Sequence, residues 1–220
     1  MTTNSNSTNP SRIVIFCKAP VAGSCKTRLA QHYGHRGAAG IARRLLNLTV
    51  DKIMCDIDIN AGTDIELCCA PTLAHPAFLS LKKRYFNQSL LFNVQSNGGL
   101  GERMFHAAKR VLKYRSHVII LGTDCPAMTS RYIMDALEKL KAGCDAVIGP
   151  ASDGGYVLIG LRVADIRLFQ NVSWGTSRVL QQTLRNCQRL NIKPVILSEL
   201  NDIDYASDWL AWKHDCIREN

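Results

Sequence analysis

Short apolar runs alternate with segments of helical periodicity along the chain. The runs are rich in Val, Ile, Leu and Cys, and the segments between them place apolar residues three or four positions apart. Alternation of this kind predicts an α/β sandwich with a mainly parallel sheet. Predicted strands occupy the run after Arg12 and residues 57–70, 89–95, 117–121, 146–149, 156–160 and 194–197. Predicted helices occupy residues 37–55, 76–83, 131–141 and 176–190, a segment from the glycines at 98–99 to about 114, and the C-terminal segment with Trp209 and Trp212.

The composition fits one globular domain. The chain has 220 residues, of which 46% are hydrophobic and 20% are charged, and this is enough for a substantial core. We expect a disordered tail at residues 1–11 and a single domain at 12–220, because the first ten residues hold neither an apolar run nor a basic region. No segment is apolar over the length that a bilayer span needs.

Charge and cysteine content indicate the kind of binding partner and the cellular compartment. The formal net charge of +9 favours an acidic partner such as a nucleotide, a nucleic acid or an anionic surface. No block of Lys and Arg dominates, and only 7% of residues are aromatic, so a nucleic-acid interface is the weaker hypothesis. Nine cysteines without a C-x-x-C pair, several inside apolar runs, favour reduced thiols and a cytoplasmic location.

The loop after the first predicted strand has the features of an anion site. The loop follows Lys18 and contains Gly23. A predicted helix begins after it, near Lys26, Thr27 and Arg28. Backbone N–H groups at a strand-to-helix turn, together with cations, are well suited to a phosphate. The alternative is an ordinary solvated first helical turn, because charged side chains usually face water.

This loop is not the P-loop of the nucleoside triphosphatases. Lys26 and Thr27 match the last two positions of G-x-x-x-x-G-K-[ST], but Pro20 and Cys25 stand where that motif has its glycines. Those glycines allow the backbone to fold closely around phosphates. The chain therefore needs a different phosphate-binding geometry.

A carboxylate follows the run at 117–121. This run reads as a buried central strand, and Asp124 comes directly after its carboxyl end. Ligands bind at that edge of open α/β sheets, and a carboxylate there can hold a divalent cation on a phosphate. The alternative is that Asp124 caps the next helix, although Thr129 or Ser130 could do so instead.

Three further predicted loops carry glycine or charged residues. The Gly98–Gly99 pair would allow close backbone approach to a ligand, and Arg103 lies in the opening turns of the helix that follows. Asp153 precedes a glycine pair and is either a turn residue or a substrate contact. Asp202 and Asp204 are two residues apart, so they share one face of an extended segment and could complete a metal site.

These loops together resemble one family. The matching blocks are Phe16–Pro20, Gly23, Lys26–Leu29, Leu100–Met104, Gly122–Pro126, Gly149–Pro150, Asp153–Tyr156, Trp174–Thr176 and Asp202–Asp204. From Ile13 to about Trp212 the chain is similar to the bacterial proteins grouped as domain of unknown function 2064 (DUF2064), also described as glycosyltransferase-like, radical-SAM/selenodomain-associated transferases. The resemblance implies a three-layer α/β/α sandwich of the nucleotide-diphosphosugar transferase (GT-A) type with a mostly parallel mixed sheet.

The resemblance also implies site residues and a cofactor. It implies Mg²⁺ or Mn²⁺ held by Asp124 and Asp204, with Asp202 as the alternative to Asp204. Catalytic roles fall to Asp124, Asp153 and Lys26. Nucleotide-binding roles fall to Lys18, Gly23, Lys26, Thr27, Arg28, Gly101 and Arg103. Substrate-binding roles fall to Asp153, Gly154, Gly155, Trp174 and Thr176.

We therefore expect a metal-dependent nucleotidyl- or glycosyltransferase that binds a nucleoside triphosphate or nucleotide sugar and an unidentified acceptor. One alternative is a non-catalytic nucleotide-binding or partner-binding protein on the same fold. The other is a nucleic-acid binder. Salt-sensitive binding to DNA or RNA without stabilisation by nucleotides would favour the latter.

Overall fold

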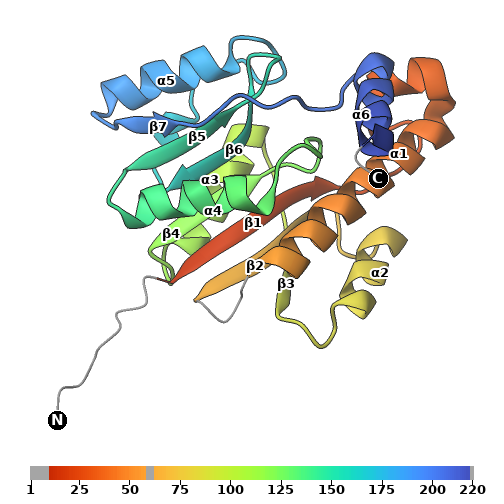
Figure 1. Cartoon of the computed structure of the whole chain (residues 1–220). Helices are drawn as coiled ribbons and strands as arrows, with labels where there is room; N and C mark the ends of the chain where they lie inside the picture. The colour runs from red at the N-terminus through yellow and green to blue at the C-terminus, as the bar shows by residue number, and fades with distance from the viewer. Residues whose placement is uncertain (1–9, 58–61, 219–220) are drawn as a thin grey trace.

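Strands and helices alternate along the described chain (Figure 1). The computed structural model describes residues 10–57 and 62–218, without the side chains of 216–218. The strands are β1 (Ser11–Lys18), β2 (Thr63–Ala70), β3 (Leu90–Val94), β4 (His117–Leu121), β5 (Ala146–Pro150), β6 (Tyr156–Leu161) and β7 (Pro194–Ile196). The helices are α1 (Thr27–Asp56), α2 (Pro76–Arg84), α3 (Leu100–Val111), α4 (Ser130–Lys141), the 3₁₀ helix η2 (Ile166–Leu168), α5 (Val179–Arg189) and α6 (Ala206–Arg218).

The strands form one mixed, mostly parallel sheet, as predicted. Its order is β3-β2-β1-β4-β6-β5-β7. β6 runs antiparallel to both of its neighbours, and all other pairs are parallel. Consecutive strands move outward from β1 to β3, and β4 then starts the other half of the sheet beside β1. The carboxyl ends of β1 and β4 therefore meet at a topological switch point.

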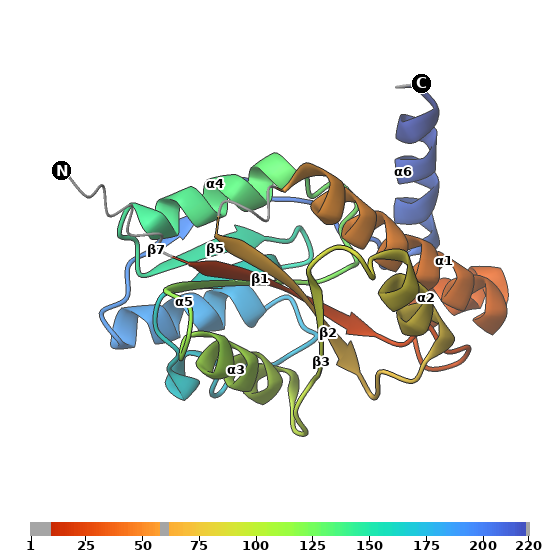
Figure 2. The same cartoon turned by 90° about the horizontal axis from the view of Figure 1, so that it is seen from below.

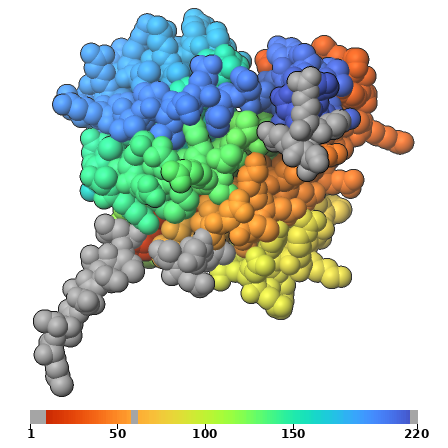
Figure 3. Space-filling view, viewed as in Figure 1, coloured from red at the N-terminus to blue at the C-terminus, as the bar shows by residue number. Residues whose placement is uncertain are grey.

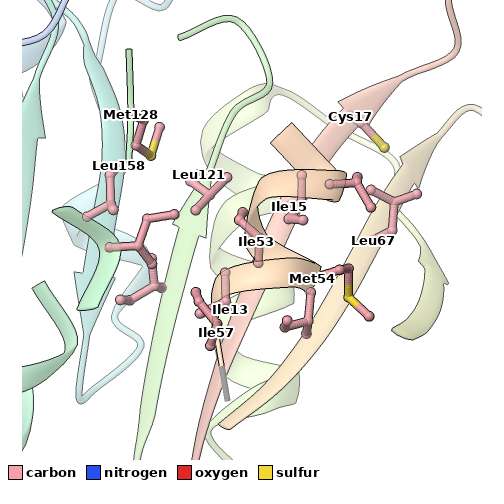
Figure 4. Close-up of a cluster of buried hydrophobic side chains, with 14 of the residues drawn as sticks. Ile13, Ile15, Cys17, Ile53, Met54, Ile57, Leu67, Leu121, Met128 and Leu158 are labelled. Atoms are coloured by element: carbon pink, nitrogen blue, oxygen red, sulfur yellow. The ribbon is translucent and has the colours of Figure 1, made fainter. Parts of the chain in front are cut away.

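Helices cover both faces of the sheet, which confirms the three-layer sandwich. In Figure 2, α1, α2 and α4 lie on one face, and α3 and α5 lie on the other. Strand residues alternate between the two cores: Ile13 and Ile15 of β1 pack under α1, whereas Val14 between them packs toward α3. Figure 4 shows the first core, where Ile53 and Met54 of α1 meet side chains from β1 and β2.

Several element boundaries differ from the prediction. β1 begins at Ser11, inside the predicted tail, because the Ser11 N–H donates to the Gly62 carbonyl (3.0 Å) and the residue pairs with both neighbouring strands. Residues 1–9 of that tail lie outside the described part. The second strand begins at Thr63 because Gly62, at φ 79°, turns the chain just before it. Residues 58–61, also predicted as strand, lie outside the described part.

Two predicted helices also change at their amino ends. α1 already begins at Thr27, and Gly34 (φ 67°, ψ 167°) kinks it into two segments, so the predicted helix at 37–55 is its second part. α5 begins at Val179 and not at Thr176. Gly175 has a positive φ of 78°, and the Thr176 hydroxyl accepts a hydrogen bond from the Arg178 N–H (3.3 Å), so residues 175–178 form a turn.

The last helix packs against the first half of α1 (Figures 1 and 3). Trp209 is 7% exposed and clusters with Leu29 and Leu45 of α1 and with Ile203. Trp209 and Trp212 stack with their ring centroids 5.2 Å apart, as expected for anchoring residues. This small core fixes the segment before α6 to the start of α1.

We expect Trp209→Ala to lower the free energy of unfolding by about 3 kcal/mol, because it removes a large side chain from a packed cluster. Leu210→Ala is the matched control: Leu210 lies on the same helix and is 53% exposed, so its change should stay within about 0.5 kcal/mol. Urea unfolding of both variants measures the difference. Equal losses would contradict a packing role for α6.

Candidate active site

The candidate site lies at the carboxyl edge of the sheet. The loop after β1 and the loop after β4 both leave the sheet there. Because β6 is antiparallel to β5, the turn between them lies at the same edge. The segment after β7 joins this edge through the hydrogen bond from the Ser152 N–H to the Leu200 carbonyl (3.1 Å). Four loops that are far apart in sequence thus converge at one place.

Lys26 connects three of these segments. It caps α1 from the left-handed region (φ 46°, ψ 49°), where a residue with a Cβ is strained by about 1 kcal/mol. Its ammonium donates to the Ile203 carbonyl and lies 3.0 Å from Asp124 Oδ2 and 3.3 Å from Asp204 Oδ1. Two of these contacts, to Ile203 and Asp204, are hydrogen bonds, and the third is an ion pair with Asp124. The side chain is only 7% exposed, and its charge lies against these two carboxylates.

Three carboxylates form a group beside Lys26. Asp153, Asp202 and Asp204 each present an oxygen, and these atoms all lie within 4.8 Å of one another. Asp153 comes from the β5–β6 turn, and the other two come from the extended segment before α6. Ile203 between them is buried, so its neighbours on either side face out together, as the two-residue spacing predicted.

The group carries unbalanced negative charge. Burial, followed by the negative charges of Asp153 and Asp204, raises the pKa of Asp202 to about 6 from an ordinary value of 3.8. Arg28 Nη1 lies 2.6 Å from Asp204 Oδ2, so the described cations offset mainly this one member. Clustered carboxylate oxygens are the ligands that Mg²⁺, Mn²⁺ and Ca²⁺ prefer. The donor set fits a hard divalent cation.

Asp124 lies in the loop after β4, as predicted, and is paired with Lys26. Its carboxylate faces Lys26 and does not belong to the three-carboxylate group. Its carbonyl accepts a hydrogen bond from the Ile203 N–H (2.8 Å), which ties the β4 loop to the acidic segment. It does not cap α4, because the Thr129 hydroxyl accepts the hydrogen bond from the Tyr132 N–H (3.1 Å).

A cleft of about 650 Å³ opens over the carboxylates. Arg28, Asp153, Asp202, Asp204 and Thr176 all line it. Of the residues predicted for the site, the structure brings these together around the loop residue Lys26. Thr27 is the first residue of α1, next to them.

Lys18 and Gly23 of the predicted anion loop are not among the residues lining that cleft. The Lys18 ammonium donates to the Ser24 carbonyl (2.6 Å) and so closes the loop on itself. Gly23 has φ 84°, a conformation that favours glycine and permits the tight turn.

Gly101 and Arg103 lie at the start of α3 and face different neighbours. Arg103 Nη1 donates to Gln95 Oε1 (2.7 Å), and the Gln95 amide nitrogen donates to the carbonyls of Cys17 (3.0 Å) and Cys68 (2.9 Å). Gly101 is buried, and a Cβ there would lie 2.8 Å from the Trp174 ring. Gln95 was not predicted, although an amide at the end of a strand was a signal for it.

The glycine pair after Asp153 has a structural role. A Cβ on Gly154 would lie 2.2 Å from the Ser177 carbonyl oxygen, so this close approach requires glycine. The Gly155 N–H donates to Asp153 Oδ1 (2.7 Å). Asp153 is thus the turn residue, one of the two predicted alternatives, and also a member of the carboxylate group.

Asp208 is a second residue that the sequence reasoning missed. Its carboxylate accepts hydrogen bonds from the N–H groups of Asp204 (3.0 Å) and Tyr205 (2.7 Å). An acidic residue at the third position of a helix commonly reaches back in this way, and this was the available signal. Asp208 therefore fixes the backbone that carries Asp204.

Comparison with known proteins assigns the family. A model described as "Uncharacterized protein conserved in bacteria (DUF2064)" matches residues 55–176, more than half of the chain. The chain belongs to the DUF2064 family. The match confirms the predicted family and includes the β4 loop and the β5–β6 turn of the site. No curated protein matches this DUF2064 chain.

Solved structures share the fold of this DUF2064 protein. A Desulfovibrio desulfuricans protein, provisionally named a nucleotide-diphospho-sugar transferase, is 30% identical, with a TM-score of 0.77 over 89% of this chain and 82% of its own. Anaerococcus prevotii 4-diphosphocytidyl-2C-methyl-D-erythritol synthase is 12% identical (TM-score 0.56; 94% and 97% covered). Mycobacterium tuberculosis glucosyl-3-phosphoglycerate synthase is 10% identical (TM-score 0.54; 92% and 75% covered). The fold is that of nucleotide-using transferases, GT-A-like as predicted.

Among the described helices, none has the length and apolar content to cross a membrane.

The carboxylate group makes a prediction about pH and stability. The folded protein holds the proton on Asp202 up to about pH 6, whereas the unfolded chain releases it near pH 4. The wild type therefore loses stability as the pH rises from about 4 to 6, and Asp202→Asn avoids this loss. In EDTA at pH 7.5 we expect the variant to be more stable by on the order of 1 kcal/mol, allowing for partial exposure.

The advantage of Asp202→Asn should disappear near pH 4. Asp145→Asn, an exposed carboxyl outside the group, serves as the control and should change little at either pH. Urea unfolding at several pH values gives the comparison. A variant less stable than wild type at pH 7.5 would contradict the assigned charge repulsion.

Proposed function

We propose that this protein is a Mg²⁺- or Mn²⁺-dependent transferase that binds a nucleoside triphosphate or nucleotide sugar and moves a nucleotidyl or glycosyl group to an acceptor. The observation that carries the proposal is the group of three carboxylates beside Lys26 and Arg28, at the switch point of the sheet. Phosphate transfer needs both signs of charge at one place, because a cation must be held by the protein and must also face the phosphates.

In this proposal Asp202 and Asp204 hold the divalent cation, and Asp153, the exposed member of the group, stays free to act as a base. When bound, the ion neutralises charge on the phosphates of the donor and of the leaving group. Asp124 is retained as a further proposed ligand because of its position after β4, although its carboxylate is paired with Lys26 in the described structure. Comparing variants of Asp124 with those of Asp204 separates a ligand from a residue that positions Lys26.

The cations of the first loop bind the donor phosphates. Arg28 faces the cleft with 49% of its side chain exposed, so it can reach a ligand without opening the fold. Lys26, with the N–H groups that begin α1 at Thr27, adds positive potential at the same place. Lys18 and Gly23 shape the loop. Arg103 and Gly101, at the start of α3, are proposed to contact the nucleotide from the other side of β1.

The acceptor is proposed to enter beside Asp153. Its hydroxyl oxygen forms the bond to the transferred group while the bond to the leaving phosphate breaks, and Asp153, which is exposed to the cleft, accepts the hydroxyl proton. The Gly154–Gly155 turn holds Asp153 in place. Thr176 and Trp174 would contact the substrate near the same turn. The residues proposed to take part in catalysis are Lys26, Asp124 and Asp153.

The comparisons support the general class of nucleotide-using transferases. The Desulfovibrio protein carries a nucleotide-diphospho-sugar transferase name, and the Mycobacterium enzyme was solved with Mn²⁺ and uridine diphosphate. A non-catalytic nucleotide-binding protein on the same fold is the alternative. Turnover of a nucleotide by this protein, measured as release of pyrophosphate or nucleoside diphosphate, would favour the catalytic function over the non-catalytic alternative.

Nucleotides should stabilise the protein only with a divalent cation. We expect Mn²⁺ with one of UDP, CTP or GTP to raise the melting temperature, because a ligand that binds the folded state alone stabilises it. Asp204→Asn keeps the shape but removes a negative charge, so this stabilisation should largely vanish. Asp215→Asn removes the same charge at the rim of the cleft and should respond like wild type. A full response in Asp204→Asn would contradict its role as a ligand.

Phosphate binding predicts a second result. Arg28→Ala should raise the dissociation constant of the nucleotide roughly tenfold or more, since a hydrogen bond to a charged group contributes about 1.5–3 kcal/mol. Lys26→Met keeps the buried stem but loses the charge, so it should weaken nucleotide binding at least as much and also lower stability. Arg36→Ala, an exposed cation of α1 away from the cleft, is the control. Unchanged affinity in both test variants, measured by calorimetry, would refute the loop assignment.

A further inference from the structure

A second cavity of about 210 Å³ lies next to the carboxylates. It is set against the face of the sheet that carries α3 and α5, and Asp153 and Asp202 line both this cavity and the larger cleft. Its other walls are mostly apolar side chains from the two halves of the sheet, from α3 and from the loop before α5, namely Phe16, Ile120, Tyr156, Met104 and Trp174.

Polar side chains line only one part of the cavity. Asp153, Asp202 and Thr176 are shared with the larger cleft, whereas the remaining large side chains are apolar or aromatic. A ligand with hydroxyls all round, such as a sugar ring, would lose hydrogen bonds to water there without replacement. A ligand with an apolar body and one polar end matches this lining.

The size of the cavity limits what can enter it. Sites for whole drug-sized ligands occupy roughly 300–1,000 Å³, so about 210 Å³ suits one or two rings or a short branched chain. The aromatic wall is held in place by its neighbours. The Trp174 ring lies edge-to-face with Tyr156, at a centroid distance of 6.2 Å, and 6.5 Å from Phe169, and it packs against Gly101. The cavity is therefore preformed.

We propose that this cavity binds the apolar body of the acceptor, and that the acceptor is an aryl or short-alkyl alcohol whose hydroxyl faces Asp153. The proposal rests on the transferase function proposed above and adds the chemical class of its second substrate. The donor phosphates and the cation occupy the larger cleft, and the acceptor body occupies the smaller cavity. Asp153, which lines both, lies where the two substrates meet.

Gly122 provides a way to fill the cavity. It lines the cavity directly after β4, and a Cβ there would meet no atom within 4 Å. Its φ is not in the left-handed region, so a side chain can be added without backbone strain. Gly122→Val should therefore fold normally while occupying the space proposed for the acceptor. Gly40→Val is a matched control, because Gly40 on α1 is equally unhindered and lies outside this cavity.

The test is an NMR titration with benzyl alcohol, with glycerol as the polyhydroxylated comparison. The indole N–H signal of Trp174 reports on the cavity, and those of Trp209 and Trp212 on α6 serve as internal references. We expect saturable shifts of the Trp174 signal with a dissociation constant of about 1–10 mM, as is usual for so small a ligand. Binding should weaken at least tenfold in Gly122→Val and stay unchanged in Gly40→Val, and glycerol should not bind.

Each result of the titration either supports or overturns the proposed acceptor cavity. Absence of saturable binding, equal binding of glycerol, or full benzyl alcohol binding in Gly122→Val would overturn the proposal. The titration is done without nucleotide, so its failure is distinct from failure of the transferase function, which would appear as absence of cation-dependent nucleotide stabilisation in the wild type. Gly122→Val should retain that stabilisation, and loss of it in a folded variant would place the cavity in the nucleotide site and overturn the acceptor assignment.

Discussion

The candidate site depends on the buried ammonium of Lys26. Its backbone is in a strained conformation, and its ammonium hydrogen-bonds to the Ile203 carbonyl and to Asp204 and forms an ion pair with Asp124. One side chain thus joins the start of α1, the loop after β4 and the segment before α6. Because the Lys26 ammonium is largely shielded from water, its attraction to the two carboxylates is stronger than it would be at the surface. Strain at this residue is compatible with the fold because the surrounding contacts determine its position.

Ile203 links this polar junction to the hydrophobic core. Its side chain packs between α1 and α6, while its N–H and carbonyl bond to Asp124 and Lys26. Because the side chains of an extended segment alternate, burying Ile203 turns Asp202 and Asp204 toward the cleft. The packing of Trp209 thus contributes to placing two acidic groups that it does not touch through polar atoms. Core and site are parts of one arrangement.

Periodicity predicted an α/β sandwich, a mainly parallel sheet and most elements, because the spacing of buried positions is a local property of the chain. The three layers and the mixed sheet were implied by the family resemblance. The resemblance also implied that Lys26, Asp124 and Asp204 belong to one site. The sequence could not predict that Lys26 would pair with Asp124, or that Asp153 and Asp202 would join Asp204 in one group. Those facts depend on side-chain distances between segments that pairing and packing bring together. The amide of Gln95 was missed for the same reason.

The reversed direction of β6 has a consequence for how this scaffold can diversify. Because β6 runs back from the edge where β5 ends, a short turn delivers Asp153 to the cleft without a crossover helix. Gly154 is fixed by its close approach to Ser177, but the exposed positions of this turn, Ser152 and Asp153, can be exchanged at little cost to the sheet. The side of the site proposed for the acceptor can thus evolve separately from the loop after β1. Related chains could acquire new substrates through changes confined to a single hairpin.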